Sequence, residues 1–386
     1  MLLDGAKKPG AKILVSGGTR CNVTNTTVSE RDFWGGKSTI VRRILRALPV
    51  TETVAFFAEI GVPLHAETDG KLFPDSNRAR DVLDALLKET ERVGAELHAD
   101  RRVLDIVRGE GGFLLQTSRG DLRARAVVLA TGGRSLPRTG SDGAGLAIVE
   151  RLGHTIVPTT PALAPLVLSD RSDDGGGFHA SLSGVAHDVE LTIAVAGARA
   201  LRLRGAMLWT HFGVSGPVAL NASRHWMRAQ VEHRDVSIAV AFWPGRSFDD
   251  ADAELTAMGR RRPKSAIATA LSASLPASVA AALLQHLHID GALPLSQLPR
   301  DRRRGLAHAL VGWPLPVTGT RGFNFAEVTA GGVALEEIDP STMASRVCPG
   351  LYLVGEILDV DGRIGGFNFQ WAWSTAHAAA FGLART

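Results

Sequence analysis

The sequence has few of the residues that mark several common classes of protein. It holds only two cysteines, Cys21 and Cys348, which cannot form a disulfide framework or supply a four-ligand metal site. So little cysteine is typical of a reducing compartment. No apolar run approaches the roughly 18 residues of a membrane-spanning helix, and residues 1–8 lack the hydrophobic segment of a signal peptide. The sequence therefore predicts a cytoplasmic protein without a membrane segment or a metal centre.

Strong charge of one sign is also missing. The chain has 43 Lys and Arg against 39 Asp and Glu, a net charge of +4, and its longest basic runs, 260–262 and 302–304, contain three residues each. Nucleic-acid binding requires more concentrated positive charge, and the single tyrosine leaves little for stacking on RNA bases. We interpret both runs as solvated helix faces. The expected partner is a small-molecule substrate and not a nucleic acid.

Length and apolar content are those of a chain with two to three domains. With 386 residues and 45% hydrophobic residues, the chain can bury a sizeable core. Helical spacing is visible at 42–60 and 78–93, and the apolar run 126–130 is typical of a strand buried on both faces of a parallel sheet. These elements predict an α/β domain.

The middle of the chain has a different pattern. Alternating stretches at 189–195 and 236–241 predict antiparallel strands, and residues 249–311 have helical periodicity. We expect one discontinuous α/β domain, formed by residues 1–160 and 320–386. The inserted domain then covers 161–319, with a strand-rich part at about 161–245 and a helical part at about 246–315.

The 42 glycines gather in short segments that follow apolar runs. The first is Ser16-Gly17-Gly18-Thr19-Arg20-Cys21-Asn22, after Ile13-Leu14-Val15, for which we predict a short buried strand or turn. Glycine allows the backbone to approach a ligand closely, and the planar fork of Arg20 suits a phosphate. The alternative is an ordinary polar turn.

Two further glycine segments are weaker signals. Thr131-Gly132-Gly133 ends the buried strand, and ligands bind at the carboxyl ends of such strands, but the chain can also simply turn there. Gly140-Ser141-Asp142-Gly143-Ala144-Gly145 opens a helical pattern. Because no clean strand precedes it, we assign it to close packing and not to a phosphate site.

The fourth segment is the most informative. An apolar strand at 351–354 ends in Gly355-Glu356, and Asp359, Asp361 and Gly365-Gly366-Phe367-Asn368 follow before a helix. The positive N-terminus of such a helix stabilises negative charge on the pyrimidine edge of a reduced flavin. The alternative is that the aspartates form a turn and Asn368 caps the helix. The helix is predicted to place one face on the core, formed by Phe369, Ala372, Trp373, Ala376 and Ala380.

The sequence offers no convincing catalytic side chains. Ser215 near His211 lacks the glycine pattern of a nucleophile elbow, and His154 is interpreted as a helix C-terminal cap. His286 and His288 point in different directions on a helix, and Cys21 is more commonly a buried structural cysteine than a reactive thiol. Catalytic residues are therefore unassigned, and any chemistry would belong to a cofactor.

Together these segments resemble a known family, the YhiN/BaiN-like flavoproteins, also called aminoacetone-oxidase-like FAD-binding enzymes. The resemblance spans nearly the whole chain and is weakest at about 245–315. It is carried by the stretches 12–25, 72–74, 130–133, 140–143, 153–154, 161–166, 210–217, 326–333, 342–343 and 355–370.

The resemblance implies a glutathione-reductase-like FAD-binding Rossmann domain, with an inserted β-barrel and helical part. Asp4 corresponds to the position that binds the ribose. The other FAD contacts of the family would fall on Ser16, Gly17, Gly18, Arg20, Cys21, Asn22, Val103, Thr131, Gly132, Gly355, Glu356, Asp359, Gly365, Gly366, Phe367 and Asn368. Trp209, His211 and Phe212 of the insert are the candidates to face a substrate.

One departure from the family is prominent. Members open with a strand, a G-x-G-x-x-G turn and a helix, whereas Met1-Leu2-Leu3-Asp4 corresponds to the end of their second strand. We expect that the recorded start lies downstream of the true one; the alternative is a genuine truncation.

The resulting prediction is an FAD-dependent oxidoreductase acting on an unidentified small molecule, with NAD(P)H as a possible reductant. No second glycine turn for a nicotinamide cofactor is visible. The alternatives are a flavin-free relative that acts as a non-catalytic binding protein, and a basic RNA-associated protein. Oligomeric state is not readable from the sequence.

Overall fold

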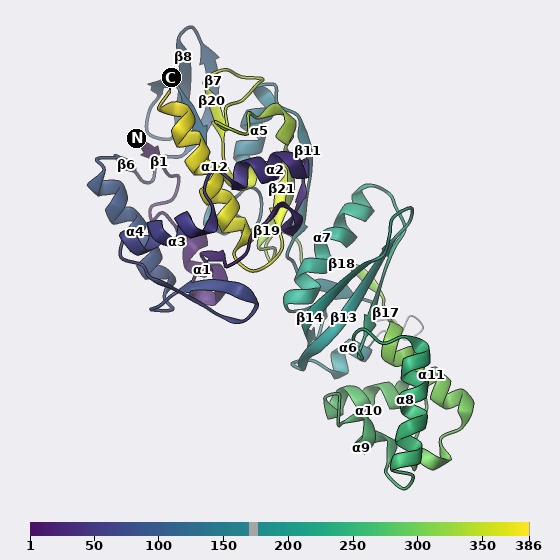
Figure 1. Ribbon diagram of the computed structural model, residues 1–386. Coiled ribbons are helices and arrows are strands. Elements are labelled where there is room, and N and C mark those ends of the chain that lie inside the picture. The colour runs from purple at the N-terminus through teal and green to yellow at the C-terminus, as the bar shows by residue number, and fades with distance from the viewer. Residues whose placement is uncertain (170–176, 386) are drawn as a thin grey trace. The chain divides into compact units, whose positions relative to one another are not determined.

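The computed structural model describes residues 1–169 and 177–385. They form two compact units, Met1–Ala162 with Phe323–Thr386, and Leu163–Gly322. We call these unit 1 and unit 2 and describe each by itself (Figure 1). None of the described helices has the length and hydropathy to cross a membrane.

Unit 1 contains two parallel strand pairs and several small antiparallel sheets. Its strands are β1 (Leu2–Leu3), β2 (Thr24–Asn25), β3 (Phe33–Gly35), β4 (Leu64–Ala66), β5 (Lys71–Pro74), β6 (Leu97–His98), β7 (Val103–Gly109), β8 (Gly112–Thr117), β9 (Leu122–Ala124), β10 (Val127–Leu129), β11 (Ile156–Ala162), β19 (Val328–Val333), β20 (Leu351–Leu353) and β21 (Val360–Gly362). The parallel pairs are β1 with β6 and β10 with β20. The antiparallel groups are β7-β8-β9, β2-β5-β4, β11-β19 and β21-β3.

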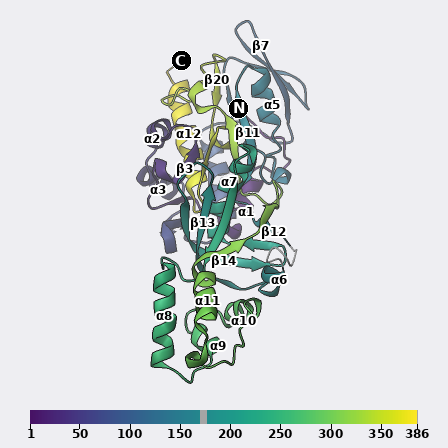
Figure 2. The same ribbon diagram turned by 90° about the vertical axis from the view of Figure 1, so that its right-hand side faces the viewer.

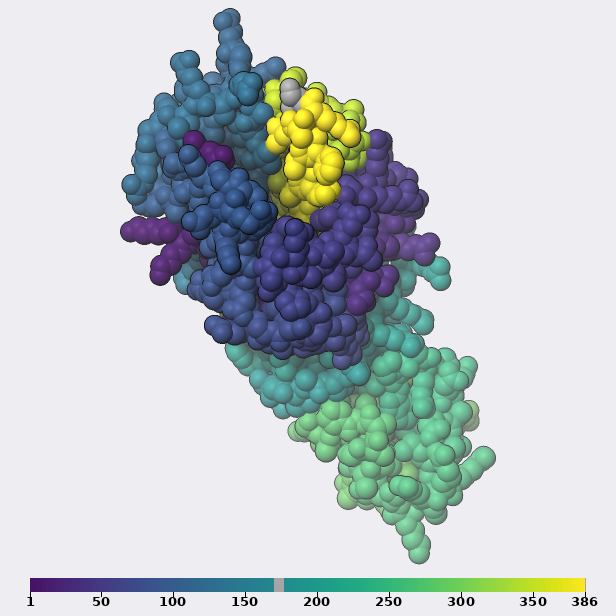
Figure 3. Space-filling view, turned by 60° about the vertical axis from the view of Figure 1, so that its left-hand side comes forward, coloured from purple at the N-terminus to yellow at the C-terminus, as the bar shows by residue number. Residues whose placement is uncertain are grey.

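The helices of unit 1 come from both ends of its sequence. They are α1 (Ala11–Thr19), α2 (Ser38–Leu45), α3 (Val50–Glu59), α4 (Ala79–Arg92), α5 (Ala144–Arg151) and α12 (Phe367–Leu383), with short 3-10 turns at Glu30–Asp32, Thr68–Gly70, Pro137–Thr139, Leu335–Glu337 and Gly355–Ile357. Figure 3 shows the yellow C-terminal helix packed beside the purple N-terminal part of the chain. Unit 1 is therefore one body built from two distant stretches of sequence.

The parallel strand predicted at 126–130 is confirmed, because Val127, Val128 and Leu129 of β10 pair in parallel with Leu351, Tyr352 and Leu353 of β20. The prediction that this strand is buried on both faces is wrong, since Val128 is 40% exposed. In the described residues, neither β1 nor β10 pairs with a further strand.

Two helix predictions need correction. The single helix expected at 42–60 is two helices, α2 and α3, because Pro49 starts α3 as its N-cap residue. The face predicted for the last helix is wrong: Ala376 and Ala380 are exposed, and the fully buried positions include Trp371, Ala378 and Ala379. Apolar residues surround α12 on all sides, so periodicity alone could not identify its buried face.

Unit 2 combines a seven-stranded antiparallel sheet with helices. The sheet has the order β17-β16-β13-β14-β15-β12-β18. Its strands are β12 (Leu166–Leu168), β13 (Ala186–Val195), β14 (Leu201–Thr210), β15 (Gly213–Ser215), β16 (Val236–Ala241), β17 (Trp313–Leu315) and β18 (Val317–Thr320). The helices are α6 (Phe178–Ser181), α7 (Pro217–Val231), α8 (Phe248–Arg261), α9 (Ile267–Leu271), α10 (Ala277–His286) and α11 (Arg300–Gly312), with a 3-10 turn at Leu295–Gln297.

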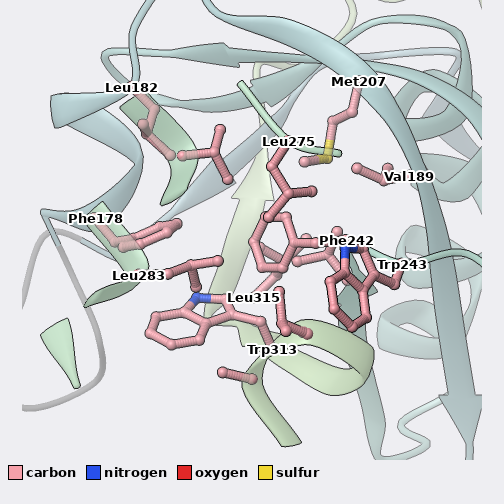
Figure 4. Close-up of a cluster of buried hydrophobic side chains, with 14 of the residues drawn as sticks. Phe178, Leu182, Val189, Met207, Phe242, Trp243, Leu275, Leu283, Trp313 and Leu315 are labelled. Atoms are coloured by element: carbon pink, nitrogen blue, oxygen red, sulfur yellow. The ribbon is translucent and has the colours of Figure 1, made fainter. Parts of the chain in front are cut away.

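The sheet and the helices of unit 2 share one core. Figure 2 shows α8 to α11 gathered at one end of the long strands β13 and β14. Figure 4 shows how side chains from the sheet and the helices meet, among them Phe178, Met207, Leu275 and Trp313. Trp209 is fully buried in this core, so its expected place facing a substrate is wrong. Its ring packs edge-on against that of Phe178, with 5.5 Å between the centroids.

Candidate functional site

The first glycine segment begins inside a helix and not after a strand. Residues 13–15 belong to α1, and the chain leaves the helical conformation at Ser16, which has ψ of 150°. The strand or turn expected there is therefore wrong, because a three-residue apolar run fits either element. The chain then passes through Gly17 and Gly18, both with positive φ. A Cβ on Gly18 would meet nothing within 4 Å, so the backbone there borders open space.

Arg20, which the sequence analysis assigned to a phosphate, holds a carboxylate in this structure. Its Nη1 lies 2.6 Å from Glu67 Oε1, and Nη2 donates to Oε2 at 3.3 Å. The guanidinium carbon lies 4.0 Å from the centroid of the Phe73 ring. The guanidinium group of Arg20 thus connects the first glycine segment to Phe73 of β5 and to Glu67, which lies before the turn Thr68–Gly70.

Cys21 is a buried structural residue. It is 0% exposed and has φ of 62°. Burial raises the pKa of its thiol to about 11, against a smaller lowering by the hydrogen bond with Ser16. At neutral pH the group is therefore a neutral thiol and not a nucleophilic thiolate.

This state of Cys21 predicts slow alkylation. We expect native protein treated with iodoacetamide at pH 8 to keep Cys21 unmodified, and the same protein in guanidinium chloride to react fully. Peptide mass spectrometry reads each cysteine separately, and Cys348, 2% exposed, serves as the internal comparison. Rapid modification of Cys21 in the folded protein would contradict the buried-thiol assignment.

The second and third glycine segments pack against each other. A Cβ on Gly132 would lie 2.7 Å from Ser141 Oγ, and the Thr131 side chain lies against Gly145 in the first turn of α5. Arg102 Nη2 donates to Asp142 Oδ2 at 2.5 Å, which connects this region to the edge formed by β1 and the start of β7. The third segment packs closely against the second, as expected from the sequence.

Asp4 and Val103 lie at that edge. Asp4 follows β1, and its Oδ1 accepts from the backbone N–H of Ala6 at 2.8 Å. Its own N–H donates to the His98 carbonyl at the end of β6. Val103 opens β7 and pairs with Thr117. Both residues are thus placed beside the carboxyl ends of the parallel pair β1–β6.

A charged ring of hydrogen bonds joins three of the glycine segments. Lys12 Nζ lies 2.5 Å from Glu356 Oε2 and 2.8 Å from Ser135 Oγ, and Ser135 Oγ donates to Glu356 Oε1 at 2.7 Å. The Thr329 N–H also donates to Oε1, at 2.9 Å. Ser135 is fully buried, and the side chains of Lys12 and Glu356 are 29% and 18% exposed. Two of the three ammonium protons of Lys12 are used here, which leaves one donor for a ligand.

Lys12 and Ser135 are site residues that the sequence analysis missed. The available signal was positional, since Lys12 opens the stretch that carries the family resemblance and Ser135 follows Thr131-Gly132-Gly133 closely. Only the folded chain brings both to Glu356.

The N-terminus of α12 is held against the first glycine segment and β2. Asn25 Nδ2 donates to the Gly365 carbonyl at 3.1 Å, and Asn22 Oδ1 accepts from the Gly366 N–H at 3.0 Å. Gly366 has φ of 91° and lies directly over the backbone of Thr24, where no Cβ fits. No described side chain caps this helix, so its first backbone N–H groups are available to a ligand.

Two residues predicted to contact FAD, Phe367 and Asn368, have side chains committed elsewhere. Phe367 is fully buried and packs edge-on against Phe33. Asn368 uses both ends of its amide on Gly362, accepting from its N–H at 2.8 Å and donating to its carbonyl at 2.9 Å. Asp359 bonds through its backbone, to Val333 and to Gly36. Phe367 and Asn368 can therefore present only backbone groups to a ligand.

We call the residues of these contacts the track. It comprises Asp4 and Val103, Asp142 and Gly132, Ser135 and Glu356, and Gly365, Gly366 and Asn22. Gly18 borders open space beside it, and a Cβ on Gly355 would meet only Ala372 Cβ, at 3.9 Å. A lysine with one remaining donor and an uncapped helix N-terminus are groups of the kind that bind the phosphates of a dinucleotide.

His154 belongs to a separate buried contact. Its Nδ1 lies 2.7 Å from Glu337 Oε2, and its Nε2 lies 2.8 Å from Ser345 Oγ. Ser345 Oγ also accepts from the backbone N–H groups of Val347 and Cys348. The histidine follows α5 and fixes the segment before β20, so its role is structural, although it is not the simple helix cap that was expected. No described group of His, Cys, Asp and Glu residues is placed to hold a metal ion.

Comparison with known proteins gives the context of this track. The family model described as HI0933-like protein Rossmann domain matches residues 1–382. The chain belongs to the HI0933-like family. This confirms the resemblance to the YhiN/BaiN-like flavoproteins and the Rossmann-type FAD-binding fold expected from the sequence. HI0933-like proteins are a family of FAD-dependent oxidoreductases.

Two relatives span almost the whole chain. The ribosomal RNA dihydrouridine synthase of Escherichia coli (strain K12) is 33% identical over 385 residues, covering 98% of this chain and 90% of its own. The 3-dehydro-bile acid delta(4,6)-reductase of Clostridium scindens is 31% identical over 378 residues, covering 98% and 91%. Among solved structures, the open conformation of a flavocytochrome c3 fumarate reductase matches 100% of this HI0933-like chain and 73% of its own, with 13% identity and a TM-score of 0.44.

Proposed function

We propose that this protein is an FAD-dependent reductase that adds hydrogen across a carbon–carbon double bond conjugated to a carbonyl group. The carrying observation is that two relatives with unlike substrates, a ribosomal RNA and a bile acid, have names that describe reduction of such a double bond. Dihydrouridine is uridine with its ring double bond reduced. A delta(4,6)-reductase removes double bonds of a steroid. The chemistry is shared even though the substrates differ.

The residues of the track are the ones that would hold the flavin. The remaining ammonium proton of Lys12 supplies a donor, and Asp4 supplies an acceptor for ribose hydroxyls. The glycine segments let the backbone approach the ligand closely. Bound FAD would supply two-electron transfer to the substrate. The uncapped N-terminus of α12 would favour negative charge on the ring that lies against it.

NAD(P)H, a two-electron hydride donor, is the reductant we propose for the flavin. A reducing cytoplasmic location stays a prediction from the scarce cysteine.

Whether the substrate is a small molecule or a nucleotide in RNA stays a prediction. The sequence analysis expects a small molecule, and the bile-acid relative agrees with that. A uridine in RNA is the second candidate, which the name of the other relative favours.

One preparation tests the proposal. Protein expressed from its complete reading frame is incubated with FAD, desalted, and reduced anaerobically by NADPH or NADH while the flavin absorption near 450 nm is followed. A steroid dienone and a uridine-containing ribosomal RNA fragment are then added separately. We expect bleaching by a nicotinamide and return of the oxidised spectrum with one of the two substrates, together with its reduced product.

Three outcomes are decisive. Protein that stays colourless after FAD addition would point to the flavin-free binding protein instead. Retained flavin that neither compound reoxidises would overturn the proposed reduction. Reoxidation by the RNA alone, with binding that weakens steeply as salt rises, would overturn the small-molecule prediction and keep the chemistry.

A further inference from the structure

A cluster of ionisable side chains lies on the small sheet β2-β5-β4, outside the flavin track. His65 of β4 lies between two carboxylates, with Nδ1 3.4 Å from Asp75 Oδ1 and Nε2 3.7 Å from Glu67 Oε1. Glu67 also holds Arg20. The His65 ring is tilted against that of Phe73, with 6.5 Å between centroids. These five residues, His65, Glu67, Asp75, Arg20 and Phe73, form what we call the His65 cluster.

The cluster is attached directly to the predicted flavin segments. Arg20 is part of the first glycine segment, and a Cβ on Gly17 would lie 3.1 Å from Phe73 Cε1. On the same strand as Phe73, Lys71 pairs with Asn25, which holds Gly365 at the start of α12. The sheet that carries His65 is therefore connected to the first glycine segment through Phe73, and to the start of α12 through Lys71 and Asn25. Both segments are predicted to contact FAD.

The members of the cluster have different chemical roles. The hydrogen bond from Arg20 lowers the pKa of Glu67, and its contact with His65 adds to the lowering, so this carboxylate is ionised and cannot donate a proton near neutral pH. Arg20 does not release protons. Histidine is the side chain that exchanges protons most readily around neutral pH. The His65 side chain is 34% exposed, so its ring can meet both solvent and a ligand.

Two other titratable side chains of unit 1 are enclosed. Cys21 is fully buried, and the His154 side chain is 0% exposed between Glu337 and Ser345. His98 is half-exposed beside Glu96 on β6, with 3.3 Å between Nε2 and Oε2, but it carries no contact to the glycine segments at the start of α12. His65 is the histidine that combines exposure, flanking carboxylates and attachment to these segments.

We infer that His65 is the general acid of the proposed reduction. This inference rests on the proposed function and adds to it the residue that completes the reaction. Glu67 and Asp75 flank the ring, and Arg20 fixes Glu67 in place.

The reduction adds one hydride and one proton across the double bond. Bound FAD in its reduced form would supply both electrons as a hydride at the carbon β to the carbonyl, and the electron pair of the double bond would shift to the α-carbon. The N–H proton of protonated His65 forms the new C–H bond at the α-carbon. The ring is left neutral and regains its proton from solvent. NAD(P)H, which becomes NAD(P)⁺, restores the reduced flavin.

The test is a comparison of two half-reactions in three proteins: wild type, His65→Gln and the control His98→Gln. The control removes a histidine of similar exposure that also lies beside a carboxylate. Each protein is reduced anaerobically with NAD(P)H and then mixed with the substrate that reoxidises wild type. We expect unchanged flavin reduction in all three, and reoxidation slowed about 100-fold or more in His65→Gln alone.

A fourth protein, His65→Ala, separates proton transfer from structural support. Added imidazole should restore at least about tenfold of its lost reoxidation rate, since a free imidazole can replace the missing acid. Reoxidation by His65→Gln within twofold of wild type would overturn the role of His65 and leave the proposed function standing. An equal loss in the flavin-reduction step, or no rescue by imidazole, would also overturn it. Wild type that no substrate reoxidises would instead overturn the proposed function.

Discussion

Gly366→Ala is expected to destabilise the protein by about 2 to 5 kcal/mol and to prevent FAD retention. Gly366 has φ of 91°, and a Cβ there would lie within 2.8 Å of Thr24 Cα and closer still to the Thr24 carbonyl. The left-handed backbone alone costs an alanine about 1 to 2 kcal/mol, and forcing a methyl group into packed backbone costs about 1 to 3 kcal/mol more. Relief of the clash would move the start of α12 away from β2, and with it the uncapped N–H groups.

The matched control for this prediction is Gly94→Ala. Gly94 also has positive φ, of 73°, but a Cβ there would meet nothing within 4 Å, so only the backbone cost of about 1 to 2 kcal/mol is expected. Chemical denaturation gives the two unfolding free energies, and equilibrium dialysis gives FAD affinity. Equal destabilisation by both substitutions, with flavin retained in Gly366→Ala, would show that the contact with Thr24 does not position α12.

Glu356→Gln is expected to destabilise the protein by about 2 to 4 kcal/mol. The substitution keeps the shape of the side chain but removes the charge that faces Lys12 at 2.5 Å. Removing one partner of a fully buried ion pair costs about 3 to 5 kcal/mol, and partial exposure of both side chains reduces that figure. The lysine is then left with Ser135 as its neighbour, so FAD binding should weaken together with stability.

A double-mutant cycle with Lys12→Met isolates the pair. If Lys12 and Glu356 act on one another, the double variant should be less destabilised than the sum of the two single variants by about 1 to 3 kcal/mol. The exposed pair Arg92–Glu89, with side chains 67% and 24% exposed, is the control, and Glu89→Gln should cost less than about 1 kcal/mol. Strict additivity of the two site variants would mean that the ring of hydrogen bonds is not a functional unit.

Much of the local structure was predictable because it depends on local signals. The strand at 126–130, the helix at 78–93 and the antiparallel strands at 189–195 and 236–241 all have strong periodicity, and the structure has β10, α4, β13 and β16 at those places. The errors occurred where an apolar run is short or uniform. Residues 13–15 form a helix, and the apolar ring around α12 concealed which of its faces is buried.

The site was predictable as a set of segments and not as a set of contacts. Glycine-rich turns after apolar runs are visible in sequence because few other residues tolerate their backbone geometry. Which side chains remain available to a ligand depends on the residues that pack against them in the folded chain. Arg20 and Asn368 were natural candidates for ligand contacts, yet Glu67 and Gly362 occupy them.

The sequence by itself determined the class of this protein. Scarce cysteine and the absence of long apolar runs limited the compartment, and the glycine segments at both ends of the chain carried the resemblance to a flavoprotein family. Only the tertiary structure decided that Lys12, Ser135 and Glu356 meet, and that His65 lies between two carboxylates beside the first glycine segment. Such contacts join residues up to 344 positions apart, and side-chain distance over such separations depends on packing of the whole unit, which no local pattern records.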